Sequence, residues 1–106
     1  MLDVPDPLQA PWGIPPARWN HYTKHRNLLG VATEQEYDES ARETIRRRIR
    51  FEYRERNGLP RVGYFDRERG RLTALEIDEN RITTHCAASE VYVRRLRDST
   101  YRWPER

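Results

Sequence analysis

The sequence predicts an α+β domain in which two N-terminal helices pack on a twisted antiparallel β-meander. Three observations support this prediction. A helix-capping pattern at Thr33 precedes side chains at helical spacing. From Ile49 onward the apolar side chains instead alternate with charged ones, as in a half-buried strand. Turn-forming residues then recur at short intervals along the meander.

Length and composition limit the chain to one small domain. The 106 residues are 36% hydrophobic and 35% charged, which suffices for a modest core. We expect a Pro-rich arm at residues 1–18, a single domain at 19–98 and a C-terminal tail at 99–106. No apolar run approaches the roughly 20 residues that cross a bilayer, and the N-terminus lacks the pattern of a secretion signal. We therefore expect a cytoplasmic protein without membrane contact.

The N-terminal segment is rich in proline, which opposes regular helix and favours extended structure. The prolines of this segment are Pro5, Pro7, Pro11, Pro15 and Pro16. Trp12 indicates that part of the arm packs on the domain. A short helix is expected over residues 16–28, and Gly30 would end it.

A second helix is expected to begin at Thr33, because Thr33 and Glu36 form a capping-box pattern. Its buried stripe is narrow. The side chains predicted to form it are Tyr37, Ala41 and either Thr44 or Ile45. The strands follow at residues 48–54, 62–66, 72–77 and 81–86, with turns at 57–58, 67–70 and 78–80. Residues 91–93 fit either a last strand or a short helix.

The residues best suited to chemistry lie in the first helix. His21 and His25 are four residues apart, with the chain's only lysine, Lys24, between them. On a helix the two imidazoles share a face. Histidine exchanges protons near neutral pH, so this pair beside a cation suggests acid–base chemistry on an anion. The third histidine, His85, follows Thr84 in the last predicted strand.

The net charge of the chain is only +3, but almost every basic residue is arginine. Guanidinium groups bind phosphate in a planar fork. For most of these arginines a solvated surface is the preferred explanation. Residues 42–56 are nevertheless basic in excess, Arg46 included, and this local bias is compatible with a phosphodiester partner.

The order of these features resembles small ribonuclease toxin domains of the barnase/EndoU/colicin/RelE-like (BECR) superfamily, in its phage- and polymorphic-toxin-associated branch. The resemblance covers roughly residues 19–92. It carries the following residues over to the family's site: His21, Lys24 and His25 on the helix, Thr84 on a strand, and the late Tyr92. The chain departs from the family pattern at Arg26, where glycine is common, and at Cys86, where an aromatic residue is usual.

The resemblance implies metal-independent RNA cleavage, in which the ribose 2′-hydroxyl attacks the adjacent phosphate and leaves a 2′,3′-cyclic phosphate. His25 would transfer one proton and either His21 or His85 the other. Thr84 would hold the phosphate, and Tyr92 would stack on a base or donate to phosphate. Lys24 would be a catalytic cation at the phosphate, with Arg54 or Arg61 as the alternative, and the candidate RNA phosphate-binding residues are Arg46, Arg54 and Arg61. RNA, with tRNA as one candidate, and an immunity or antitoxin protein are the implied partners, and no cofactor is expected.

Other functions remain open from the residues alone. Either histidine taken singly fits a hydrogen-bonded structural side chain. His21 and His25 also have the spacing of two zinc ligands, which His85 or Cys86 would have to complete. A further alternative is a non-catalytic module on the same fold that binds nucleic acid or a protein partner.

Overall fold

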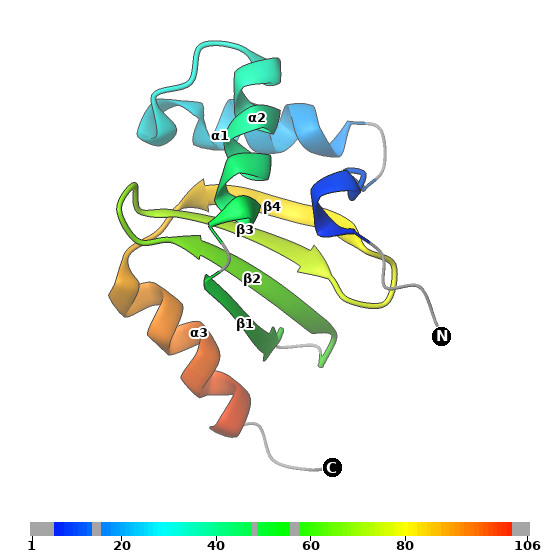
Figure 1. Cartoon of the computed structure of the whole chain (residues 1–106), viewed down its shortest axis with the longest axis vertical. Helices are drawn as coiled ribbons and strands as arrows, with labels where there is room; N and C mark the ends of the chain where they lie inside the picture. The colour runs from blue at the N-terminus through cyan, green and yellow to red at the C-terminus, as the bar shows by residue number, and fades with distance from the viewer. Residues whose placement is uncertain (1–5, 14–15, 48, 56–57, 103–106) are drawn as a thin grey trace.

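The computed structural model describes residues 6–13, 16–47, 49–55 and 58–102 of the chain. Two helices precede a four-stranded antiparallel sheet and a third helix follows it (Figure 1), so the predicted α+β class is confirmed. The elements are η1 (Pro7–Gln9), α1 (Ala17–Leu29), α2 (Glu34–Arg46), β1 (Ile49–Arg54), β2 (Pro60–Asp66), β3 (Arg71–Glu76), β4 (Arg81–Ala87) and α3 (Glu90–Arg102). Within the described ranges, no helix has the length and apolar character that a membrane span needs.

Local signals set the ends of α1 and α2 as predicted. Gly30 ends α1 in the left-handed conformation, with φ of 68°, which glycine adopts without steric cost. Thr33 begins α2, because its hydroxyl accepts from the backbone N–H of Glu36 at 3.1 Å while the Glu36 carboxylate accepts from the N–H of Thr33 at 3.1 Å. The buried face of α2 comprises Tyr37, Ser40, Ala41, Thr44 and Ile45.

The strands form an antiparallel sheet in the order β1-β2-β3-β4, as the meander predicts. Helix α2 covers one face of this sheet, where Ile45 packs with Val62 and Leu75 in the hydrophobic core. Helix α1 contacts the edge strand β4, and α3 contacts the opposite edge strand β1 (Figure 1). The sheet therefore separates α1 from α3 and leaves β4 beside α1.

Neighbouring residues of β4 face opposite sides of the sheet. His85 pairs with Thr73 in β3, and both side chains reach α2. Thr84 pairs with Ala74, so its side chain lies on the other face. This alternation decides which of the predicted site residues can meet.

The C-terminal element, which the sequence left open between strand and helix, is a helix. The Ser89 hydroxyl accepts from the backbone N–H of Tyr92 at 3.1 Å and so satisfies a donor in the first turn of α3. The helix runs to Arg102, into the segment expected to be a tail. In the turn predicted at 57–58, Gly58 has φ of 85°, whereas Asn57 lies outside the described residues, as does position 48 of the first strand.

The N-terminal arm packs on the domain in its described part, residues 6–13. Ala10 is completely buried in the core between the arm, α2 and the sheet. The Arg42 guanidinium of α2 donates to the carbonyl oxygens of Leu8, at 3.1 Å, and of Ala10. The carbonyl of Pro11 accepts from the backbone N–H of Ile82 in β4 at 2.8 Å. The arm is therefore part of the fold.

Replacing Gly63 with alanine should destabilise the protein. Gly63 of β2 pairs with Phe51 of β1, whose ring lies over it, and an added methyl group would overlap that ring. Overpacking of this kind costs about 1–3 kcal/mol of unfolding free energy. Urea unfolding would measure the loss in wild type and in a Phe51→Leu background. An equal loss in both backgrounds would show that the ring is not the cause.

Candidate functional site

Three residues predicted to form the site converge where α1 lies against β4. The Nδ1 atom of His21 is 3.3 Å from the Thr84 hydroxyl oxygen. The His25 ring stacks on His21 with a centroid distance of 5.9 Å and an angle of 10° between the ring planes. The helical repeat explains the stacking, because residues four apart lie one above the other. We call the surface formed by His21, Lys24, His25 and Thr84 the β4-edge site.

The environment of the two imidazoles favours their neutral forms. Partial burial lowers the pKa of His21, and the Lys24 ammonium lowers it further. Burial also lowers the pKa of His25, with smaller contributions from His21 and Lys24. Both rings are therefore mainly unprotonated at neutral pH. In that form each can accept a proton, and each donates one more readily once it is protonated.

Cys86 is close enough to Lys24 and to Tyr92 for electrostatic effects on titration. Burial raises the pKa of the Cys86 thiol, and Lys24 partly opposes this increase. The pKa of Tyr92 is raised by burial and then by Cys86. Cys86 lies two residues after Thr84 and therefore on the same face of β4. Tyr92, at the start of α3, is 46% exposed.

His85 lies on the opposite side of the sheet from the β4-edge site. Its ring is completely buried, with Nε2 at 2.8 Å from the Ser40 hydroxyl and Nδ1 at 2.9 Å from the Thr73 hydroxyl and 3.0 Å from the carbonyl oxygen of Leu72. Burial lowers the pKa of His85 to about 3. A substrate cannot reach this ring, so the prediction of His85 as a proton-transfer group is wrong.

Arg61, one predicted phosphate ligand, is only 7% exposed. Its guanidinium pairs with Glu55 at 3.0 Å and with Glu76 at 3.8 Å. Two carboxylates therefore balance its charge, and binding a phosphate there would require breaking these partly buried ion pairs. The prediction of Arg61 as a phosphate ligand therefore does not fit the structure.

The two other predicted phosphate ligands have partners away from the imidazoles. Arg46 pairs with Glu43 on its own helix, α2, at 3.1 Å. Arg54, at the end of β1, donates to the carbonyl oxygen of Gly58 at 2.8 Å. Lys24 is exposed, and its charge affects both imidazoles. Among these predicted cations, Lys24 is therefore the best placed for a phosphate at the β4-edge site.

The zinc alternative required a third ligand beside His21 and His25. Among the described residues, no three histidine, cysteine, aspartate or glutamate side chains lie together as a metal site would need. His85 faces the opposite side of the sheet, as shown above. Within the described residues, His21 and His25 therefore have no further ligands of the kind that zinc usually takes.

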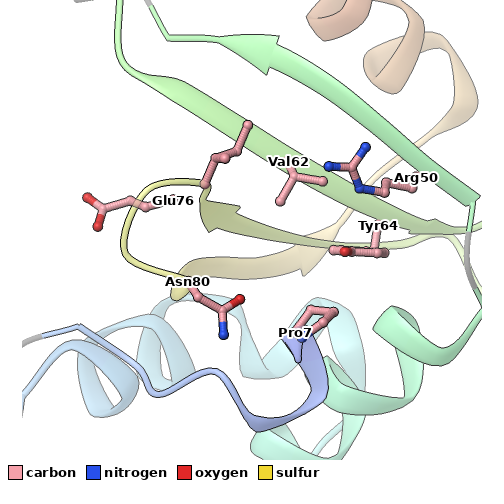
Figure 2. Close-up of a pocket in the computed structure, with 7 residues that line it drawn as sticks. Pro7, Arg50, Val62, Tyr64, Glu76 and Asn80 are labelled. Atoms are coloured by element: carbon pink, nitrogen blue, oxygen red, sulfur yellow. The ribbon is translucent and has the colours of Figure 1, made fainter. Parts of the chain in front are cut away.

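A hollow of about 150 Å³ lies on the α2 side of the sheet, near η1. In Figure 2, Val62 and Tyr64 of β2 lie across from Pro7 of η1. The remaining lining residues are Arg50, Glu76, Ile77 and Asn80. None of the predicted catalytic residues lines this hollow, so it does not compete with the β4-edge site.

Sequence reasoning assigned Trp12 to packing and missed its place beside the site. Its ring centroid is 6.3 Å from that of His21, with 32° between the planes. The prolines around Trp12 predict an extended arm but give no indication of where the arm lies. The contact with His21 is set by tertiary packing, which no local pattern in the sequence encodes.

Comparison of the chain with protein-family models, with curated proteins and with solved structures found no match. Neither a family nor an activity is therefore carried over from a relative. The geometry of the β4-edge site is the basis for inferring a function.

Proposed function

We propose that the protein is an endoribonuclease that cleaves RNA at the β4-edge site without a metal ion. The observation that supports this most is the convergence of His21, His25 and Thr84, from two elements distant in sequence, with the Lys24 cation beside them. Two groups that titrate near neutrality, next to a cation, are what phosphodiester transfer to a neighbouring hydroxyl requires.

The reaction would proceed by proton transfer at both ends of one phosphodiester. One imidazole of the His21/His25 pair removes the proton of the ribose 2′-hydroxyl, whose oxygen forms a bond to phosphorus. The other imidazole, protonated, gives its proton to the 5′-oxygen as the bond from phosphorus to that oxygen breaks. The products are a 2′,3′-cyclic phosphate and a 5′-hydroxyl. Lys24 would stabilise the charge that develops on the non-bridging oxygens.

Thr84 and Tyr92 would serve substrate placement in this scheme. The Thr84 hydroxyl holds the His21 ring at Nδ1 and leaves Nε2 for the substrate. Tyr92 presents a partly exposed ring on which a base can stack. We propose RNA, with tRNA as one candidate, as the substrate and the cytoplasm as the place of action. A toxin role with an immunity or antitoxin partner follows from the resemblance alone.

The test is incubation of the purified protein with total RNA and with tRNA in excess chelator. We expect discrete fragments whose 3′ ends carry cyclic phosphate, and their absence with a folded His21→Ala, His25→Ala double variant. If the wild type binds RNA without cutting it, the non-catalytic binding module becomes the better description. Cleavage that persists in the double variant would place the reaction elsewhere or indicate a contaminating nuclease.

The pH dependence of cleavage should be bell-shaped with its maximum below pH 6.5. The acid must be protonated, so kcat/KM falls as pH rises through the acid's pKa, and the base must be neutral, so kcat/KM falls as pH drops below the base's pKa. Both histidines have pKa values lowered from 6.5, chiefly by burial. Initial rates measured from pH 4 to pH 9 check this. A maximum above pH 7 would contradict the assignment.

A further inference from the structure

Trp12 is held in place by three contacts with α2 and β4. Its indole N–H donates to the Asp38 carboxylate at 2.7 Å. Its ring stacks on Tyr37 with a centroid distance of 5.4 Å and 27° between the planes. Its backbone forms a parallel bridge with Ile82 of β4. Position and ring orientation are thus both fixed by neighbours far away in sequence.

The arm that carries Trp12 is itself fixed to α2. Arg42 pairs with Asp38 at 3.1 Å and donates from its other terminal nitrogen to the carbonyls of Leu8 and Ala10. The Arg42 guanidinium thus links Asp38, which accepts from the Trp12 indole, to the backbone just before Trp12. Figure 1 shows η1 beside α2, where these contacts are made.

We infer that Trp12 is a positioning residue for His21: the arm holds the indole against the imidazole so that His21 faces Thr84. The inference about catalysis rests on the proposed function, whereas the inference about ring position does not. The His21 ring has three neighbours: the Trp12 indole, the Thr84 hydroxyl at Nδ1 and the His25 ring. Without the indole, the imidazole would be free to turn away from Thr84.

In the part of the chain that the structure describes, few charged or titratable groups face His21. The Lys24 ammonium lowers the pKa of His21 from the same helix, the His25 ring stacks on the His21 ring, and the Thr84 hydroxyl contacts it from β4. Asp38 of α2 is engaged by the Trp12 N–H and by Arg42. The arm contributes an aromatic surface that excludes water from the imidazole, and exclusion of water disfavours the protonated ring.

The experiment is an NMR titration of the histidine rings in a Trp12→Leu variant, beside a matched Trp19→Leu control. Trp19 lies on α1, is 53% exposed and contacts Tyr22. We expect the pKa of His21 to rise toward 6.5 in Trp12→Leu and to stay at its wild-type value in Trp19→Leu. For RNA cleavage, we expect kcat to fall by about 10–10²-fold in Trp12→Leu with KM unchanged, since misplacement of a catalytic group mainly affects the chemical step.

Two further variants keep the inference testable if Trp12→Leu does not fold. Asp38→Asn retains an acceptor for the indole N–H and should behave as wild type, whereas Asp38→Leu removes it and should move the His21 pKa in the same direction as Trp12→Leu. An unchanged His21 pKa in folded Trp12→Leu or Asp38→Leu protein would overturn the positioning role. If the wild type cuts no RNA, the proposed function fails, but the titration still decides the position of the ring.

Discussion

Replacement of His25 by alanine should slow RNA cleavage by about 10²–10⁴-fold, the usual contribution of a positioned proton-transfer group. The loss should appear in kcat and in kcat/KM alike, because His25 acts on the transition state and contributes little to ground-state binding. His25 is partly exposed on α1, so its removal should leave the fold intact. Initial rates on a defined oligoribonucleotide, with RNA affinity measured in parallel, check this prediction.

The matched control is Asn27→Ala, an exposed position on the same helix. It should cleave RNA at the wild-type rate. The His21→Ala, His25→Ala double variant should lose little more than the poorer single variant, because groups that act as a unit are not additive. Multiplicative losses in the double variant would mean that the two rings contribute independently and do not act as a unit. Full activity in His25→Ala would remove His25 from the mechanism.

The protein should lose stability as the pH falls from 6.5 toward 3, chiefly because of His85. Burial lowers the pKa of His85 from 6.5 to about 3, so the unfolded chain binds a proton that the folded chain excludes. The stabilisation is complete above pH 6.5 and is lost progressively below it. Its size is on the order of a few kcal/mol of unfolding free energy. Urea unfolding at pH 7, 6, 5 and 4 measures this loss.

The control for this effect is His85→Gln, which removes the titratable group and keeps a donor and an acceptor for Ser40 and Thr73. The variant should be less stable than wild type at pH 7 but should lose less stability on acidification. His21 and His25 act in the same direction, although more weakly because both are partly exposed. An unchanged pH dependence in His85→Gln would show that the acid sensitivity has another source.

Much of the fold was predictable because its signals are local. The capping box at Thr33, the glycine at position 30 and the period-two pattern from Ile49 each specify the conformation of a few neighbouring residues. The C-terminal element was ambiguous because its local signals disagree. Val91, Tyr92 and Val93 favour a strand by propensity, and the Ser89 hydroxyl and the packing of Val93 on the sheet side favour the helix that forms.

The candidate site was less predictable, because its members meet through tertiary packing. The spacing of His21 and His25 places them on one face of a helix, but nothing in that spacing specifies β4 as their neighbour. His85 follows Thr84 in sequence, yet strand alternation sends the two side chains to opposite faces. The sequence alone does not show whether the Thr84 or the His85 side chain points toward α1.

The bridge between the arm and β4 also limits how much of the β4 edge is open to another chain. β4 is an edge strand, and an open edge offers backbone groups to any other extended chain. The N–H of Ile82 is already taken by the carbonyl of Pro11, and Trp12 lies alongside the same edge. The described part of the arm therefore covers this part of the β4 edge, and Pro11, which has no N–H group, cannot donate a hydrogen bond to a further strand.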